Sequence, residues 1–232
     1  MKNDRAFEAV IFDLFGTIIR NLSSADYRAM LTRMASELGV CSDDFIRIWS
    51  SIINIRMTGQ SGSMENNIRW VCEEMGVSTT KAQLSAATEI RLDFTRQHFV
   101  PIGDAIPTLQ TLRECGIKTG LVSDCTAEVP HLWPQTPFLP LFDATVFSCL
   151  VGTTKPDPLM YTTISERLGV EPNKCIYIGD GSNQELSGAR LIGMRALLVA
   201  GPQTDLANVD RSDFTHWDGD KISTLSEVLM MV

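Results

Sequence analysis

An acidic residue stands at the end of a short apolar run near the start of the chain. The run VIF (10–12) ends at Asp13, and the tight turn FGT (15–17) follows closely. A short apolar run bounded by a glycine turn predicts a buried parallel strand, and an open α/β sheet forms its ligand crevice at the carboxyl ends of such strands. A lone carboxylate is costly to bury there unless it meets a metal, a cation or a substrate. Asp13 is therefore a candidate nucleophile.

Three later segments bring further chemical groups to predicted strand ends and helix starts. They are LVSDCT (121–126), TKPDPLMY (154–161) and YIGDGSNQELSGA (177–189). Together with DLFGT (13–17), they resemble the four motifs of the haloacid dehalogenase (HAD) superfamily, in order and along nearly the whole chain. The resemblance implies a hydrolase with a Rossmann-like core and a helical cap inserted after the first motif.

The resemblance implies a role for each motif around a phosphate group. Asp13 would attack and form a covalent intermediate, which splits one hard displacement into two easier ones. Ser123 would hydrogen-bond a phosphate oxygen. Asp124 stands where the family commonly has Asn, so its backbone N–H rather than its charge would contact the substrate. Gly16 and Thr17, in the turn after the nucleophile, complete this predicted substrate-binding set.

Lys155 and two further acids complete the predicted catalytic constellation. The Lys155 ammonium beside Asp13 would lower the cost of bringing two anions together. In the resembling enzymes, an acidic pair at the spacing of Asp180 and Glu185 holds Mg²⁺, and Glu185 replaces the family's usual Asp with a longer arm. Asp13 and the backbone carbonyl of Phe15 would be the other protein ligands. Magnesium prefers such oxygen ligands and keeps several waters.

One residue departs from the phosphatase pattern. Phosphatases of the family carry Asp two positions after the nucleophile, where it protonates the leaving group and then activates water. This chain has Phe15 there, which can do neither. Proton transfer of this kind contributes about 10²–10⁴-fold to a rate. The sequence therefore predicts a leaving group that departs without an acid, or a site that no longer turns over.

Three functions remain open. The first is a Mg²⁺-dependent phosphohydrolase acting on a small phosphorylated metabolite whose leaving group is an acyl group, an anhydride or an acidic phenol. The second is a metal-independent 2-haloacid dehalogenase, because a halide needs no acid, and because that branch has an aromatic residue at the equivalent of Phe15 and a similar spacing from Lys155 to Tyr161. The third is a binding or regulatory protein that kept the fold. Dehalogenases lack the Gly179-Asp180 pair, which favours the first alternative.

The residues after the first motif change character and predict an all-helical cap over 21–99. Amphipathic segments follow one another with no strand between them, at 23–39, 42–59, 64–75 and 78–98. The cap would select the substrate and exclude water when it closes. Arg20, directly after the first strand, and Arg56, before the loop TGQSGS (58–63), are the candidate substrate contacts.

Strands and helices alternate in the rest of the chain. This alternation predicts a doubly wound parallel α/β sheet built from 1–20 and 100–232. The predicted strands are 117–123, 144–149, 174–180 and 195–201, and the predicted helices are 104–115, 157–168, 183–192 and 222–231. The proline-rich segment 131–142 is predicted to be an irregular packed connection.

Charge and composition limit the classes of partner that the chain is expected to bind. The net charge is −8, from 20 basic and 28 acidic residues, which argues against general binding to nucleic acid or to an anionic membrane. The first residues, MKNDRAF, contain no apolar signal core, and no apolar run is long enough to span a bilayer, which predicts a cytoplasmic protein. The expected partner is a small-molecule substrate, and no pattern in the sequence indicates an oligomeric state.

Overall fold

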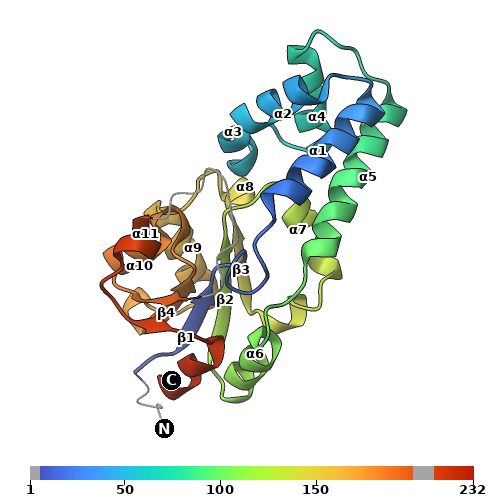
Figure 1. The fold of residues 1–232 in the computed structure, drawn as a ribbon. Helices are drawn as coiled ribbons and strands as arrows, with labels where there is room; N and C mark the ends of the chain where they lie inside the picture. The colour runs from blue at the N-terminus through green and yellow to red at the C-terminus, as the bar shows by residue number, and fades with distance from the viewer. Residues whose placement is uncertain (1–5, 201–211) are drawn as a thin grey trace.

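The core of the molecule is a parallel six-stranded sheet. The structure is a computed structural model, and it describes residues 6–200 and 212–232. The strand order is β3-β2-β1-β4-β5-β6, so the chain winds outward in both directions from β1 (Figure 1). The strands are β1 (Ala9–Phe12), β2 (Lys118–Ser123), β3 (Ala144–Phe147), β4 (Cys175–Gly179), β5 (Arg195–Val199) and β6 (Lys221–Ile222). The predicted doubly wound α/β fold is confirmed.

Helices cover both faces of the sheet. Every residue of β1 is therefore buried, and every one is apolar. Val10 and Phe12 belong to the core cluster on one face, and Ala9 and Ile11 to the cluster on the other. The first face is covered by α6 (Ala105–Glu114) and the 3₁₀ segment η5 (Leu225–Met230), and the second by α9 (Pro158–Leu168) and α10 (Glu185–Leu191).

Strand register brings the motifs to one edge of the sheet. Phe12 pairs with Leu121 of β2 on one side and with Ile178 of β4 on the other. Asp13 and Asp180 therefore leave the sheet side by side, and the Asp13 N–H donates to the Ile178 carbonyl at 2.9 Å. Since the carboxyl ends of parallel strands meet here, this edge positions the predicted site.

A helical unit stands off this edge of the sheet (Figure 1). Its hydrophobic cluster, which includes Met34, Phe45, Trp49 and Ile68, draws its buried members from residues 30–87. It is joined to the sheet domain where Ile19 and Pro101 form an antiparallel bridge. Its helices are α1 (Ser24–Leu38), α2 (Ser42–Ser51), α3 (Ile53–Met57), α4 (Met64–Glu74) and α5 (Lys81–His98). The helical insertion between β1 and β2 is confirmed, and its exact boundaries at residues 21 and 99 stay a prediction.

Local signals explain both ends of α1. Ser23 caps α1 by accepting from the Asp26 N–H at 3.4 Å, and Gly39 ends the helix with φ 70°. The predicted single helix over 42–59 is wrong. It is broken into α2 and α3 at Ile52, whose φ of −96° and ψ of 15° leave the helical region.

The C-terminal half differs from prediction in three places. The strand predicted over 144–149 ends at Phe147. Residues 221–222 form a sixth strand, and the final helix over 222–231 is instead the 3₁₀ segment η5. The predicted helix 183–192 starts only at Glu185, because Asn183 and Gln184 adopt left-handed φ angles of 51° and 54°. Gly201, the end of a predicted strand, lies outside the described residues.

The remaining elements are short. The connection over 131–142 is irregular, as predicted, and its Trp133 and Phe138 rings stack with centroids 6.0 Å apart. Within 6–200 and 212–232, no helix is long and apolar enough to cross a bilayer. The short segments are α7 (Glu128–Leu132), η1 (Trp133–Gln135), η2 (Leu139–Leu141), α8 (Ser148–Val151), η3 (Pro172–Lys174), η4 (Ser182–Gln184) and α11 (Ser212–His216).

Candidate active site

A lysine joins two buried carboxylates at the centre of the site. Lys155, in the loop before α9, places its Nζ 2.5 Å from Asp13 Oδ1 and 2.6 Å from Glu185 Oε2. The Tyr177 hydroxyl donates to the same Glu185 oxygen at 2.8 Å, and the Gly181 N–H donates to Oε1 at 3.0 Å. All three charged side chains are buried. Glu185 therefore positions the lysine, in addition to its predicted role as a metal ligand.

Burial and mutual repulsion raise the pKa values of these acids. Burial raises the pKa of Asp13 to about 6; Lys155 opposes this, and the nearby Asp180 charge adds to it. Burial likewise raises the pKa of Glu185 to about 8, against Lys155 and with help from Asp13 and Asp180. Burial alone would lower the pKa of Lys155, but Asp13 and Glu185 outweigh it and hold that pKa well above its usual range. The site therefore holds more negative than positive charge.

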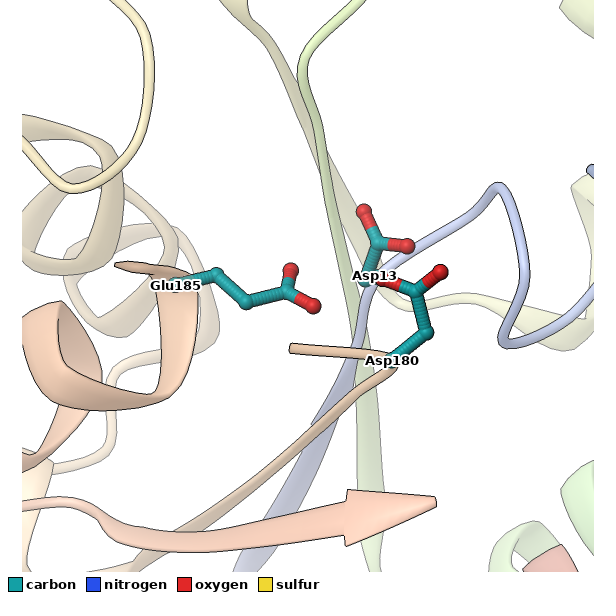
Figure 2. A group of neighbouring side chains, drawn as sticks. All are labelled: Asp13, Asp180 and Glu185. Atoms are coloured by element: carbon teal, nitrogen blue, oxygen red, sulfur yellow. The ribbon is translucent and has the colours of Figure 1, made fainter. Parts of the chain in front are cut away.

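Asp180 completes an acidic trio. Asp13, Asp180 and Glu185 each offer one carboxylate oxygen, and these oxygens lie within 4.8 Å of one another. In Figure 2, Asp13 and Asp180 lie next to each other at the strand ends, and Glu185 extends toward them from its helix. Three buried carboxylates face one ammonium, and all the donors are oxygens, so a divalent cation such as Mg²⁺ fits both the charge and the donor set. The trio is thus suited to hold a metal ion.

The turn after Asp13 is shaped around Asp180. Gly16 has φ 82°, and a Cβ on it would lie 2.3 Å from Asp180 Oδ2, so any other residue would strain the turn and displace Asp180. Asn21 donates to that oxygen at 3.0 Å. Thr17 and Ser123 are buried, and among the described residues neither hydroxyl has a hydrogen-bond partner. Two unpartnered buried hydroxyls beside a nucleophile are groups that a bound phosphoryl oxygen would satisfy.

Asp124 is occupied by the protein itself. Its Oδ1 accepts from the Lys155 backbone N–H at 2.9 Å, and its Oδ2 lies 3.4 Å from the Asn183 amide. Burial raises its pKa, although Lys155 opposes the shift. The side chain therefore holds the lysine loop and the start of the last motif together, while its predicted role toward the substrate stays a prediction.

The two arginines proposed as substrate contacts lie in different surroundings. Arg20 is exposed. Arg56 is buried in the helical insertion, with its guanidinium carbon 4.0 Å from the centroid of the Trp49 ring. Phe15 is partly buried against the sheet-domain core, so its ring is a packing group.

The family follows from comparison with known proteins. A model of the haloacid dehalogenase-like hydrolase family matches residues 7–193, which is most of the chain. The chain belongs to this family. Membership makes it a hydrolase and leaves the phosphatase and dehalogenase alternatives open.

Relatives of both kinds resemble this hydrolase. It is 28% identical over 159 residues to the glyceraldehyde 3-phosphate phosphatase of Methanopyrus kandleri, covering 67% of each chain. It is 27% identical over 200 residues to a phosphatase of Mycobacterium tuberculosis, covering 84% of this chain and 88% of the other. Among solved structures, the fold resembles a 2-haloacid dehalogenase of Pseudomonas syringae pv. Tomato, with a TM-score of 0.72, 22% identity and 97% of each chain covered.

Three supporting residues of the hydrolase were missed in the sequence. Asn21 binds Asp180, Asn183 reaches Asp124, and Tyr177 binds both Lys155 and Glu185. Tyr177 lies inside an apolar strand, where nothing in the sequence separates a core ring from a site ring. Asn183 lies inside the motif 177–189 and Asn21 lies shortly after the motif 13–17, so membership of a motif or proximity to one was the available signal.

Proposed function

We propose that this hydrolase is a Mg²⁺-dependent phosphohydrolase that acts through an aspartyl-phosphate intermediate on a small phosphorylated metabolite with a good leaving group. The observation that carries this proposal is the buried trio of Asp13, Asp180 and Glu185. Glu185 also holds Lys155, so Asp180 is the acid for which a metal-independent hydrolase of an anionic substrate has no use. The phosphatases among the curated relatives support the same class of substrate.

The residues of the chain supply the nucleophile for the first half of the reaction and hold the phosphoryl group through both halves. The Asp13 carboxylate attacks phosphorus, the bond to the leaving oxygen breaks, and that oxygen departs with its electron pair. Water then attacks phosphorus of the aspartyl phosphate, the bond from phosphorus to the Asp13 oxygen breaks, and inorganic phosphate leaves with both protons of the water. Lys155 holds the nucleophile in place, and the hydroxyls of Thr17 and Ser123 donate to phosphoryl oxygens.

The metal site would use the predicted ligands. Asp13, Asp180 and the backbone carbonyl of Phe15 would hold Mg²⁺, with Glu185 reaching it directly or through water. When bound, the ion supplies positive charge that neutralises the phosphoryl group.

Chelation tests this proposal directly. With acetyl phosphate as substrate, phosphate release is expected to fall about 100-fold in EDTA and to return when Mg²⁺ is added, because the surplus carboxylates repel the phosphoryl group without a cation. Colorimetric phosphate release measures the rate. Phosphate release that is indifferent to EDTA argues against the proposal.

Substitution of Phe15 tests the missing acid. Phe15→Asp is expected to raise kcat for an alkyl ester such as glycerol 3-phosphate by about tenfold, because an alkoxide leaves poorly without a proton. Phe15→Leu is the matched control, since it also changes the ring but adds no acid. An equal response of both variants means that the leaving-group argument is wrong.

The dehalogenase is the second candidate, and Phe15 is the observation that favours it. A carbon–halogen bond breaks without a proton, so Asp13 would attack carbon and form an ester instead. Chloride release from 2-chloropropionate that persists in EDTA is the result that selects this alternative.

A further inference from the structure

Two arginines of the helical insertion lie buried at its contact with the sheet domain. Arg56 belongs to α3 and Arg91 to α5, and they are 2% and 5% exposed. Long charged side chains are seldom buried to this extent without a partner of opposite charge. Among the described residues, Glu128 of α7 is the buried carboxylate whose charge acts on both of them.

Glu128 already forms an ion pair with one of the two arginines. It forms a buried ion pair with Arg91 Nη2 and also accepts from the Thr126 hydroxyl. Arg56 instead has the face of Trp49 on one side and the phenol of Tyr27 beside it. The cluster of Arg56, Arg91 and Glu128 therefore holds two positive charges against one negative charge.

The surplus positive charge affects the neighbouring phenol of Tyr27. Burial raises the pKa of the Tyr27 phenol, but Arg91 and Arg56 outweigh burial and lower it. Among the described residues, no acceptor lies within hydrogen-bond distance of Arg56 Nε or of Arg91 Nε and Nη1. Buried donors without acceptors are rare in proteins, and groups of this kind are the ones that a ligand satisfies.

The cluster lies next to the reaction centre along the chain and in space. Glu128 follows the Ser123–Asp124 motif by only a few residues. Burial raises the pKa of the Cys125 thiol, and the charges of both Glu128 and Asp124 add to this shift, so both carboxylates lie near that thiol. On the other side, α3 contacts α8, and a Cβ on Gly59 would lie 2.0 Å from the Cys149 carbonyl. Figure 1 shows α3 and α5 meeting α8 and α7 above the strand ends.

We propose that Arg56 and Arg91 form a second anion subsite, which binds a carboxylate of the substrate while its phosphate lies at Asp13. This proposal deepens the proposed function and rests on it: the substrate is then a phosphorylated carboxylic acid. Arg56 and Arg91 are specificity-determining residues, and Glu128 is a positioning residue that holds Arg91.

Charge selects a carboxylate over a second phosphate. One surplus positive charge matches one carboxylate, whereas a phosphate dianion would leave the buried cluster negative. The unpartnered nitrogens of the two arginines can each donate a charge-assisted hydrogen bond to such a carboxylate.

Non-hydrolysable phosphonates test the subsite without turnover. Calorimetry with Mg²⁺ would compare phosphonoacetate, 3-phosphonopropionate and 4-phosphonobutyrate with methyl-, ethyl- and propylphosphonate. The best carboxylated probe is expected to bind at least about tenfold more tightly than its matched alkylphosphonate, from hydrogen bonds to a charged group. If no chain length shows a preference, the subsite is refuted.

Variants connect the preference to the arginines. Arg56→Gln is expected to reduce the ratio of the two affinities, carboxylated probe over matched alkylphosphonate, to about one. Arg56→Lys is expected to give an intermediate ratio. The control Arg47→Gln, which changes an exposed arginine of α2, is expected to leave the ratio unchanged. A ratio is insensitive to an inactive fraction of protein, and circular dichroism checks the fold. A preference that survives Arg56→Gln overturns the proposal. Hydrolysis of acetyl phosphate, measured separately, decides the proposed function, so the two failures are distinguishable.

Discussion

Asp13→Asn is expected to lower phosphate release from acetyl phosphate by at least about 10⁴-fold, since loss of a covalent nucleophile removes the whole reaction path. The amide keeps the size of the side chain but is a very poor nucleophile. Lys155 binds only Oδ1 of this carboxylate, so the second oxygen can point toward phosphorus. Single-turnover phosphate release measures the effect.

The same substitution should not weaken the fold. The raised pKa of Asp13 means that its ionised form is disfavoured in the folded protein, so a neutral amide removes repulsion with Asp180. The melting temperature without metal is expected to stay the same or rise. Asp26→Asn, in an exposed carboxylate of α1, is the matched control. An Asp13→Asn protein that is folded and still active would exclude Asp13 as the nucleophile.

Lys155→Met is expected to reduce both activity and stability. Without the ammonium, Asp13 and Glu185 face each other as unpaired buried carboxylates, and breaking a buried pair of this kind costs about 3–5 kcal/mol. Activity is expected to fall about 10³-fold, because the charge that steadies the nucleophile and the phosphoryl group is lost. Urea unfolding and steady-state kinetics measure the two effects.

A double variant separates the two effects of Lys155. Lys155→Met with Glu185→Gln is expected to recover much of the lost stability, because one of the uncompensated charges is gone, but not the activity. Lys81→Met, at an exposed position of α5, is the control and should change neither. If Lys155→Met is as stable as the parent protein, the ion pairs seen in the structure do not contribute as argued.

The predictable part of the fold rested on local signals. Ser23 and Gly39 mark the ends of α1 because a cap residue and a left-handed glycine act within a few residues. The apolar run of β1 reads as a buried parallel strand for a similar reason. The two-residue strand β6 and the break at Ile52 carry no comparable signal, since pairing with β5 and packing inside the helical insertion produce them.

The sequence by itself determined which groups reach the reaction centre. Asp13 and Asp180 follow strands, and Ser123 is the last residue of one. The order of these strands is set by alternating apolar runs and helices, and parallel strands must bring their carboxyl ends to one edge. The four motifs therefore identified the family, and Phe15 raised the question of which leaving group the enzyme can accept.

Only the tertiary structure decided what these groups do to one another. It made Glu185 the partner of Lys155, turned Asp124 to the lysine loop, and placed Arg56 in a buried cluster with Arg91 and Glu128. The physical reason is that spacing along a chain fixes the position of a backbone atom but not the direction of a long side chain. That direction depends on the burial and charge of neighbours that lie far away in the sequence.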